Sequence, residues 1–281
     1  MLMRRIAPLR IFFCASIFSY LLAENELHLV EYIEIPKELQ SLRLKPDKIN
    51  WSMRNSFLLL DSYNSELVLI KNSGEIQFSN VLGIRYNVHG ELTWAGNSPI
   101  GIQVVDRLEN EIIILDLNLN LIQNIPIDFY LYPEIVQIDT WGKLFMYSST
   151  YNGIYLFEKN YISKVPFIDF YKIFYSNYCI KDFAISRDGK LAILGCDGIL
   201  SEFSQNGLRL ASTPIEIFNP NFLVPLYDDW LIINSKGECQ AIYSSNKISL
   251  PKIHSEILDV AELDRSIAIL TKEQILVLNV R

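Results

Sequence analysis

Residues 57–78 read FLLLDSYNSELVLIKNSGEIQF. Three short apolar runs are separated by two polar turns, a pattern that is typical of consecutive antiparallel strands and not of a helix. Similar segments return along the chain, and the steps between their first residues are 45, 42, 47, 40 and 36 residues. This spacing is the length of one four-stranded blade of a β-propeller. The repeats begin at Phe57, Ile102, Leu144, Leu191, Leu231 and Ile267.

A further strand is predicted ahead of each repeat. In several copies this strand leads into the repeat through a tight turn, such as Thr140–Lys143 or Arg187–Lys190, where a glycine adopts a positive φ angle without strain. The sequence therefore predicts an all-β fold, a six-bladed β-propeller of four-stranded blades. The predicted inner strands are Ile49–Met53, Leu92–Ala95, Glu134–Asp139, Ile180–Ile185, Phe222–Leu226 and Glu256–Ala261.

The two ends of the repeat region complement each other. The sixth repeat stops at Arg281 after three strands, and a strand-like segment, Glu26–Ile35, precedes the first blade. We expect Glu26–Ile35 to complete the last blade as its outermost strand. Closure of the ring in this way protects the strand edges and holds both termini in place.

The second repeat carries the most specific pattern. Val105–Asp116 reads VDRLENEIIILD and resembles the NHL-repeat consensus, in which Asp, a turn and Asn-x-Arg-Ile precede an aromatic-Asp strand end. Leu60–Ile70 is similar to the same pattern, and Glu111 and Glu66 stand where that consensus has Arg. The resemblance implies a six-bladed NHL-like propeller of exported bacterial proteins. Such propellers are mostly binding platforms, with a few lyase and lactonase relatives.

The N-terminal segment is typical of a secretory signal peptide. Arg4, Arg5 and Arg10 precede the apolar run Ile11–Ala23, and Glu24 begins a polar stretch. We therefore predict a signal peptide over residues 1–23 and a propeller domain over residues 24–281. The protein would be periplasmic, on the cell surface or secreted, with no membrane span after cleavage. An uncleaved N-terminal anchor is the alternative, although the run is short for a free-standing span of the bilayer.

The net charge restricts the class of partner, and the cysteine count restricts the number of disulfides. The net charge is −7 and there is no run of Lys or Arg, which argues against a nucleic-acid partner. Beyond the predicted signal peptide the cysteines are Cys179, Cys196 and Cys239, and an odd number permits at most one internal disulfide. Buried free thiols are favoured over a bridge between two of them.

The sequence contains no recognisable catalytic or cofactor motif, so we expect no cofactor and no metal site. The histidines, His28, His89 and His254, fall in separate segments without a neighbouring His or Cys. Asp61 and Asp106 end equivalent strands, where an aspartate typically caps the backbone N–H groups that follow. Tryptophans are predicted to serve packing. Trp51 and Trp94 fall in inner strands and should be buried, whereas Trp141 and Trp230 fall at predicted turns.

An aromatic segment separates the third and fourth repeats. Phe167–Tyr178 reads FIDFYKIFYSNY, with six aromatic residues spaced like one face of a helix. We expect a short helix with Phe170, Phe174 and Tyr178 directed inward. Tyr171 and Tyr175 would then be free to contact a ligand or the preceding crossover. The candidate binding face is Tyr130, Tyr132, Tyr171 and Tyr175; the alternative is a lid whose aromatic rings seal the axial channel.

These observations favour a non-enzymatic binding or scaffold module for a protein, a peptide or an envelope polymer. The alternative is a metal-dependent propeller hydrolase or lyase, lactonase-like, that acts on a small metabolite. An architectural subunit of a larger envelope assembly is the third possibility.

Overall fold

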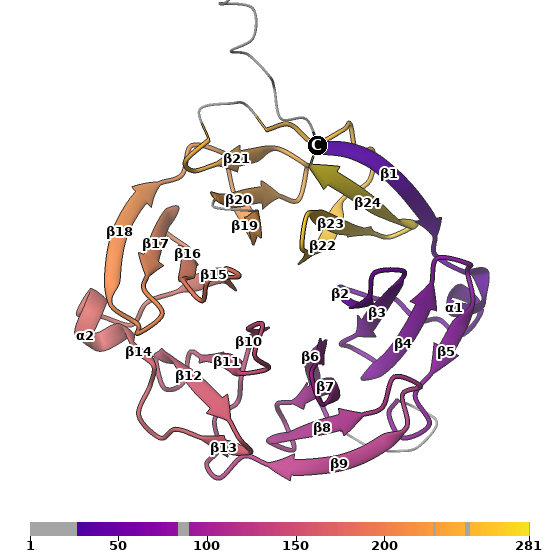
Figure 1. Cartoon of the computed structure of the whole chain (residues 1–281), viewed down its shortest axis with the longest axis horizontal. Coiled ribbons are helices and arrows are strands. Elements are labelled where there is room, and N and C mark those ends of the chain that lie inside the picture. Colours follow the sequence, from indigo (N-terminus) through magenta and orange to yellow (C-terminus); the bar gives the residue numbers. More distant parts are fainter. Residues whose placement is uncertain (1–26, 84–89, 227–228, 245–247, 281) are drawn as a thin grey trace, which may run out of the picture.

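Figure 1 shows six small sheets arranged as a ring around a central axis in the computed structural model, which describes residues 27–83, 90–226, 229–244 and 248–280. Each sheet is antiparallel, and in blades one to five the strands follow the chain from the axis outward, whereas the outermost strand of blade six comes from the N-terminal part of the chain. The prediction of a six-bladed β-propeller is confirmed.

The blades follow in sequence order. Blade one holds β2 (Lys48–Met53), β3 (Ser56–Asp61), β4 (Glu66–Lys71) and β5 (Ile76–Phe78). Blade two holds β6 (Leu92–Ser98), β7 (Gly101–Asp106), β8 (Glu111–Leu115) and β9 (Leu121–Pro126). Blade three holds β10 (Ile135–Ile138), β11 (Leu144–Ser148), β12 (Gly153–Glu158) and β13 (Tyr161–Ile162), and β14 (Ile168–Asp169) also pairs with β12.

Blade four holds β15 (Ile180–Ile185), β16 (Leu191–Gly195), β17 (Ile199–Phe203) and β18 (Arg209–Pro214). Blade five shows three strands within its described residues, β19 (Pro220–Leu226), β20 (Asp229–Asn234) and β21 (Cys239–Ala241). Blade six holds β22 (Ile257–Leu263), β23 (Ser266–Thr271), β24 (Gln274–Val280) and β1 (Leu27–Glu34). Two short helices, α1 (Lys37–Ser41) and α2 (Phe170–Phe174), lie in the segments that lead into blades one and four.

The second strands are buried on both faces because every blade packs between two others, whereas outermost strands such as β9 and β18 are largely exposed. In β3 all six residues are buried, and alternate side chains reach opposite neighbours. Phe57 and Leu59 pack with residues of blade six, whereas Leu58 and Leu60 pack with residues of blade two. Continuous apolar runs, and not strict alternation, are therefore the sequence pattern of these strands.

The N-terminal strand closes the ring as predicted. β1 pairs with β24 from His28 opposite Asn279 to Glu34 opposite Gln274, so it is the outermost strand of blade six. Two hydrogen bonds cross the seam between blades six and one near the axis. The carboxylate of Asp259 accepts the backbone N–H of Ile49 at 2.8 Å, and the indole N–H of Trp51 donates to the carbonyl of Ala261 at 3.2 Å.

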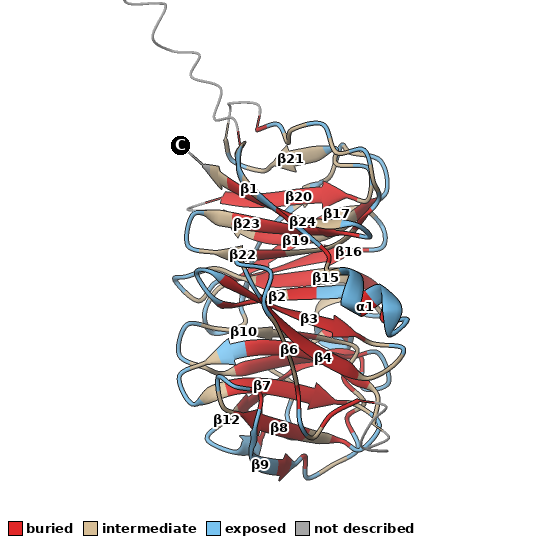
Figure 2. Ribbon diagram, turned by 90° about the vertical axis from the view of Figure 1, so that its right-hand side faces the viewer, coloured by how far each residue is buried: buried red, intermediate tan, exposed pale blue. Residues whose placement is uncertain are grey.

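The ring has two flat faces, which are visible edge-on in Figure 2. We call the crossover face the one where the chain enters each blade and where second strands turn into third strands. We call the opposite one the hairpin face, because first and second strands join there. In Figure 2, α1 projects from the crossover face.

On the crossover face, a side chain at the end of each second strand holds the incoming crossover in blades one and two. Asp61 accepts the backbone N–H groups of Lys45 and Asn64, at 2.7 and 2.9 Å. Asp106 accepts those of Glu91 and Leu108, both at 3.0 Å. The predicted capping role of both aspartates is confirmed, and the bond to the crossover is an addition that the sequence pattern does not reveal.

Asn110, the asparagine of the NHL-like pattern, fastens the next crossover. Its amide donates to the carbonyls of Ile127 and Phe129, and its amide oxygen accepts the N–H of Leu131. Asn152 of blade three fastens the crossover into blade four in the same way, because its amide donates to the backbone carbonyl of Ser176. Both asparagines adopt a positive φ angle, which Asn tolerates better than most residues.

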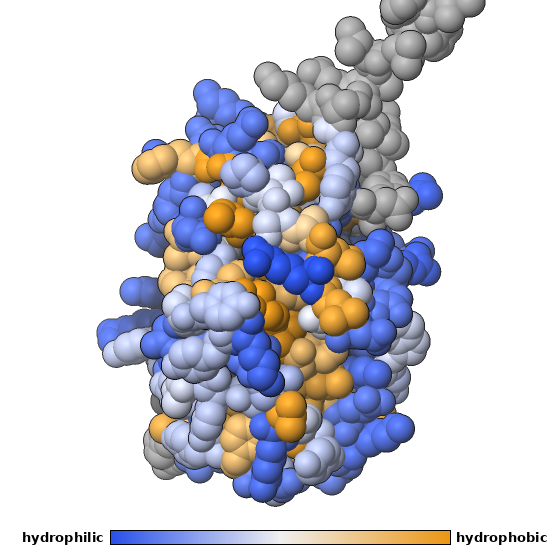
Figure 3. All heavy atoms as spheres, turned by 90° about the vertical axis from the view of Figure 1, so that its left-hand side faces the viewer, coloured by the Kyte–Doolittle hydropathy of each residue, from blue (hydrophilic) through white to orange (hydrophobic). Residues whose placement is uncertain are grey.

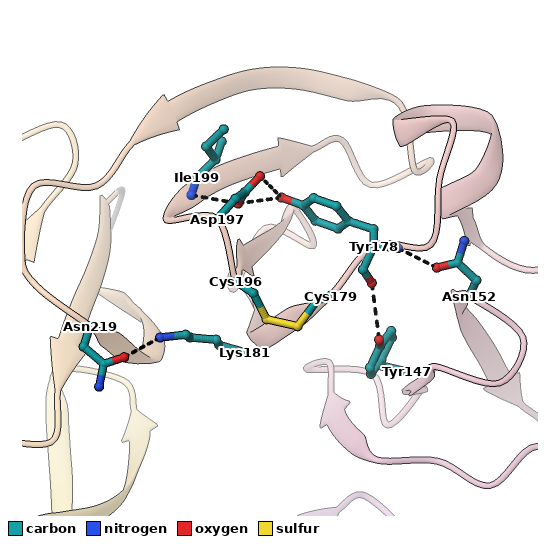
Figure 4. Close-up of a disulfide and its surroundings, with 9 residues drawn as sticks. All are labelled: Tyr147, Asn152, Tyr178, Cys179, Lys181, Cys196, Asp197, Ile199 and Asn219. Carbon is teal, nitrogen blue, oxygen red and sulfur yellow. Dashed lines mark hydrogen bonds between the residues drawn. A yellow bond between two sulfur atoms is a disulfide. The ribbon is translucent and has the colours of Figure 1, made fainter.

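In blade four a disulfide joins the end of the second strand to the incoming crossover, where blades one and two use Asp61 and Asp106. Cys179 lies in the crossover and Cys196 follows β16, and the two are joined with a Cα–Cα distance of 5.5 Å (Figure 4). The expectation of free thiols is therefore wrong for this pair. The two cysteines flank a predicted hairpin at matching ends, so strand pairing brings them together. Cys239 keeps a free thiol, which donates to the carbonyl of Ile248 at 3.2 Å.

The tryptophan predictions are confirmed with one exception. Trp51 and Trp94 are 5% and 9% exposed, and Trp141 lies in the turn between β10 and β11. Trp230 is instead part of β20, where its indole N–H donates to the buried carboxylate of Glu202 at 2.9 Å. Residues 1–23, the predicted signal peptide, lie outside the described residues. Among the described residues no helix combines the length and apolar character needed to cross a membrane.

Loss of the disulfide should weaken the domain without changing its fold. The double substitution Cys179→Ser, Cys196→Ser removes a cross-link over a short loop, so we expect a loss of about 2–4 kcal/mol of unfolding free energy. Urea unfolding with and without a thiol reductant measures this. The reductant should act on the parent and on Cys239→Ser but not on the double variant; equal sensitivity of all three would contradict the assignment.

The closing strand should contribute to the stability of the whole ring. Ile33 in β1 is 6% exposed and packs with blade one, whereas its neighbour Tyr32 is 62% exposed. Ile33→Ala should cost about 2–4 kcal/mol of unfolding free energy because it leaves a cavity in the seam. Tyr32→Ala should cost about 0.5 kcal/mol or less. Thermal melting of both variants tests closure, and equal melting temperatures would argue against it.

Candidate functional site

Tyr130 and Tyr132 lie in the crossover into blade three and form one half of the candidate binding face. Their rings stack with centroids 6.4 Å apart. The hydroxyl of Tyr132 donates to Glu91 at 3.1 Å, and the guanidinium carbon of Arg107 lies 4.9 Å from the centre of the Tyr132 ring. Arg107 also forms an ion pair with Glu91. Tyr132 is thus held on three sides, whereas Tyr130 is exposed.

The electrostatics of this cluster agree with its contacts. The hydrogen bond from Arg107 lowers the pKa of Glu91 below its usual value, with a smaller contribution from Tyr132. The hydrogen bond to Glu91 raises the pKa of the Tyr132 phenol. At neutral pH the cluster therefore consists of a carboxylate, a guanidinium and a neutral phenol.

Tyr171 and Tyr175 form the other half of the candidate binding face. The helix that carries them is shorter than the predicted aromatic segment, because β14 precedes it and Tyr175 ends it in the left-handed conformation with φ 57°. Asp169 caps its first turn by accepting the N–H of Lys172. Tyr171 is 56% exposed and Tyr175 is 89% exposed.

The inward side of α2 is anchored as expected. Phe170 is fully buried, and Phe174 stacks on Tyr178 with ring centroids 3.7 Å apart and planes 9° apart. The hydroxyl of Tyr178 donates to Asp197, and its backbone N–H donates to Asn152 (Figure 4). Figure 1 places α2 at the outer rim of the ring and not over its axis, which is not the position of a lid.

The structure does not bring the two tyrosine pairs into ring contact. Tyr130 and Tyr132 contact each other, and Tyr132 also contacts Arg107. Tyr171 and Tyr175 are exposed. Further exposed aromatic residues occur on the same face. They are Tyr63 and Tyr151 in turns between second and third strands, and Phe218 in the crossover into blade five.

A large open depression lies on the hairpin face. Its volume is about 1210 Å³, and it extends from the axis to the seam between blades six and one. Its apolar lining residues include Trp51, Ile138, Ile185 and Pro225 on inner strands and Val277 on β24. Arginines from three different blades line it as well: Arg54, Arg187 and Arg265.

One carboxylate links two of these arginines. Asp264 lies 3.3 Å from the guanidinium of Arg54 and 4.0 Å from that of Arg187. Glu262 also lines the depression, and burial raises the pKa of its carboxyl to about 8, with a further contribution from Asp264. At neutral pH Glu262 is mostly protonated and does not neutralise an arginine.

A second group of charges surrounds the axis. Lys48, Asp182 and Asp259 lie on inner strands, and Asp259 is the main reason that the pKa of Lys48 is raised. Burial raises the pKa of Asp182 to about 7. Asp182 accepts the backbone N–H of Leu223 at 2.8 Å, as Asp259 does for Ile49, so both carboxylates join neighbouring blades.

In the described part of the chain, no group of three or more His, Cys, Asp or Glu side chains could hold a metal ion. His28 lies on β1 and His254 in the crossover into blade six. His89 lies outside the described residues.

No protein-family model matches the chain, and no curated protein sequence matches it either, so the NHL resemblance is not confirmed. Solved structures share the fold. A virginiamycin B lyase from Staphylococcus aureus has a TM-score of 0.61 at 11% identity, over 89% of this chain and 99% of that chain. YCF48 bound to a D1 peptide has a TM-score of 0.58 at 10% identity, over 89% and 96%.

BBS1N in complex with ARL6DN has a TM-score of 0.54 at 10% identity, over 80% of this chain and 75% of that chain. At such identities the likeness shows the fold alone. The neighbours include a lyase and propellers that bind protein partners.

The depression on the hairpin face is the feature that sequence reasoning missed. The aromatic composition of the sequence points to the crossovers, whereas the arginines of the depression lie in the short turns between first and second strands. Alignment of those turns across the blades would have shown Arg54, Arg187 and Arg265 at similar positions. Charge in equivalent turns of a closed ring is a sequence pattern that indicates convergence.

Glu262 should make stability depend on pH. Because its folded pKa is about 8 and its unfolded value is near 4.5, its contribution is complete below about pH 4.5 and is lost as pH rises through about 8. Glu262→Gln should therefore change unfolding free energy little at about pH 4 and increase it by about 1–2 kcal/mol at about pH 9. Chemical denaturation across pH measures the difference, with the exposed Glu256→Gln as control. Parallel pH profiles for parent and Glu262→Gln would refute this assignment.

Proposed function

We propose that this chain is an exported, non-enzymatic β-propeller that binds a protein or peptide partner on its crossover face. The observation that carries this proposal is the pair of exposed tyrosines, Tyr171 and Tyr175, on a firmly anchored helix at the rim. Tyrosine suits an interface because its ring buries a large area at low entropic cost while its hydroxyl remains available for a hydrogen bond.

The anchoring of α2 supports preorganised recognition. Phe170, Phe174 and Tyr178 pack on the ring, and the Arg209 guanidinium carbon of β18 lies 5.2 Å from the centre of the Phe174 ring. A rigid aromatic pair loses little conformational freedom when a partner binds, so more of its contact energy remains as affinity.

The flank beside α2 extends this surface. Figure 3 shows apolar side chains gathered in a furrow on the side of the ring that carries α2 and β18, with charged groups along its borders. Exposed apolar residues of this region are Val165, Leu208 and Leu210. A mixture of aromatic anchors, apolar area and a polar rim is the composition of a protein interface.

Two further observations support the proposal that the protein is exported. The basic N-terminal segment followed by the apolar run Ile11–Ala23 is typical of a signal peptide. The Cys179–Cys196 disulfide is in keeping with an oxidising compartment, where such bonds form and persist. YCF48 and BBS1 show that this fold is compatible with peptide and protein partners.

Removal of the two tyrosines should separate binding from folding. Tyr171→Ala, Tyr175→Ala should cost about 1 kcal/mol or less of unfolding free energy, because both rings are exposed. Retention of partners from an envelope extract should fall by about tenfold or more, since interface aromatics often contribute roughly 2 kcal/mol each. Quantitative affinity capture measures retention, and thermal melting measures stability.

The matched control changes two aromatic residues on the hairpin face, at the other end of the strands. Trp141→Ala, Tyr161→Ala removes two exposed aromatic residues from the hairpin face and should leave retention unchanged. Equal retention by the parent and the Tyr171, Tyr175 variant would refute the proposed surface. A loss of about 3–5 kcal/mol in that variant would instead identify the two rings as core residues.

A further inference from the structure

The Cys179–Cys196 disulfide lies at the surface of the crossover face, where both cysteines are exposed. It closes the open end of the β15–β16 hairpin, directly beside the pair formed by Ile180 and Gly195. The backbone N–H of Cys196 also donates to the carbonyl of Cys179 at 3.0 Å. Strand pairing therefore holds this hairpin without the disulfide. Exposed disulfides are more readily reduced than buried structural ones, and many of them are regulatory.

Tyr178 connects the disulfide to α2. Its hydroxyl donates to Asp197 at 3.1 Å, so this hydrogen bond and the disulfide join the same two segments (Figure 4). Its ring stacks on Phe174, the last residue of α2. Burial and the nearby Asp197 carboxylate raise the pKa of the Tyr178 phenol, so the hydroxyl stays protonated and remains a donor.

The end of the second strand differs between blade four and the first two blades. Asp61 and Asp106 hold the incoming crossover at this place in blades one and two, whereas β16 ends in Gly195. A side chain at Gly195 would collide with the hydroxyl of Tyr178, so the absence of a side chain makes room for the phenol. In blade four the crossover itself thus supplies the side chain at this strand end, and the disulfide fixes the neighbouring residue.

The other end of this crossover is held by blade three. The amide oxygen of Asn152 accepts the backbone N–H of Tyr178 at 2.9 Å, and its amide group donates to the carbonyl of Ser176 at 3.1 Å. These bonds do not involve the disulfide. Reduction would therefore release the attachment of the crossover to blade four and leave its attachment to blade three in place.

The two exposed tyrosines depend on the support beneath them. The backbone N–H of Tyr175 donates to the carbonyl of Tyr171 at 3.1 Å, so one hydrogen bond of α2 links both residues. Phe174 directly precedes Tyr175 and rests on Tyr178. Movement of Tyr178 would therefore loosen the turn that presents the two exposed rings.

We propose that the Cys179–Cys196 disulfide is a redox switch for binding through α2. The oxidised form holds Tyr178 in place and so presents Tyr171 and Tyr175 in a fixed arrangement. A dithiol reductant supplies two electrons and two protons, breaks the S–S bond to give two thiols, and itself becomes a disulfide. The reduced chain keeps its fold, but α2 must be ordered again when a partner binds, which costs affinity. The effect on partner binding rests on the proposed function.

Reduction of the folded protein is the first test. The parent is incubated with an excess of dithiothreitol without denaturant, free thiols are alkylated, and peptide mapping locates the label. Cys179 and Cys196 should both be labelled while the far-ultraviolet circular dichroism of the strands is unchanged. A disulfide that resists dithiothreitol until the chain unfolds would be purely structural and would overturn the proposal.

Backbone hydrogen exchange measures the loosening of α2 without any partner. Peptides that cover residues 170–178 should exchange about fivefold to tenfold faster in the reduced parent and in Cys179→Ser, Cys196→Ser than in the oxidised parent. Peptides over residues 127–133, the crossover that Asn110 fastens, should not change.

Ile33→Ala is the matched control, since it should weaken the ring to a similar extent and leaves the disulfide intact. It should exchange like the oxidised parent over residues 170–178. Equal exchange of this segment in the oxidised and reduced parent would overturn the switch. An equal acceleration in Ile33→Ala would do the same, because it would show that only global stability had changed.

Retention from an envelope extract then tests the effect on binding. Cys179→Ser, Cys196→Ser should retain about threefold to tenfold less partner than the parent, because part of the contact energy is spent on ordering α2. If Tyr171→Ala, Tyr175→Ala loses retention but the double cysteine variant keeps it, the proposed surface stands and the switch is wrong. If neither variant loses retention, the proposed surface is wrong and the switch has no binding to control; the exchange rates still measure how the disulfide holds α2.

Discussion

The ring depends on the attachment of each crossover to the strand end beside it. A single blade cannot bury both faces of its sheet, so it is stable only when the chain places the next blade against it. In blades one to five a side chain at the end of the second strand makes this attachment. Asp61 and Asp106 bind backbone N–H groups, Ser148 and Asn234 bind carbonyls, and Cys196 forms a disulfide.

The contrast between the packed strands and the turns explains where binding sites can form on the ring. Strands and their attachments are occupied with packing, so the turns of the two flat faces are free to vary. The crossover face carries exposed aromatic residues such as Tyr175, whereas the hairpin face carries arginines such as Arg187 around a depression.

Much of the architecture could be predicted from the sequence because propeller contacts repeat along the chain. The six copies, the inner strands and the closing strand β1 all follow from apolar runs and their spacing. Capping by Asp61 and Asp106 follows from their position at strand ends. Of the candidate site, the aromatic segment around Tyr171 was visible, but its helix ends at Phe174 because Tyr175 adopts the left-handed conformation.

The sequence by itself determined the period, the strand order and the residues that occupy the turns, since these depend on neighbours in the chain. Only the tertiary structure decided which distant turns meet. Arg54 and Asp264 are 210 residues apart and lie 3.3 Å apart because blade six closes on blade one. Trp230 likewise meets a distant partner, because its indole N–H donates to the buried carboxylate of Glu202 in the preceding blade. Ring closure brings these groups together. The curvature that closes the ring cannot be read from any local sequence pattern.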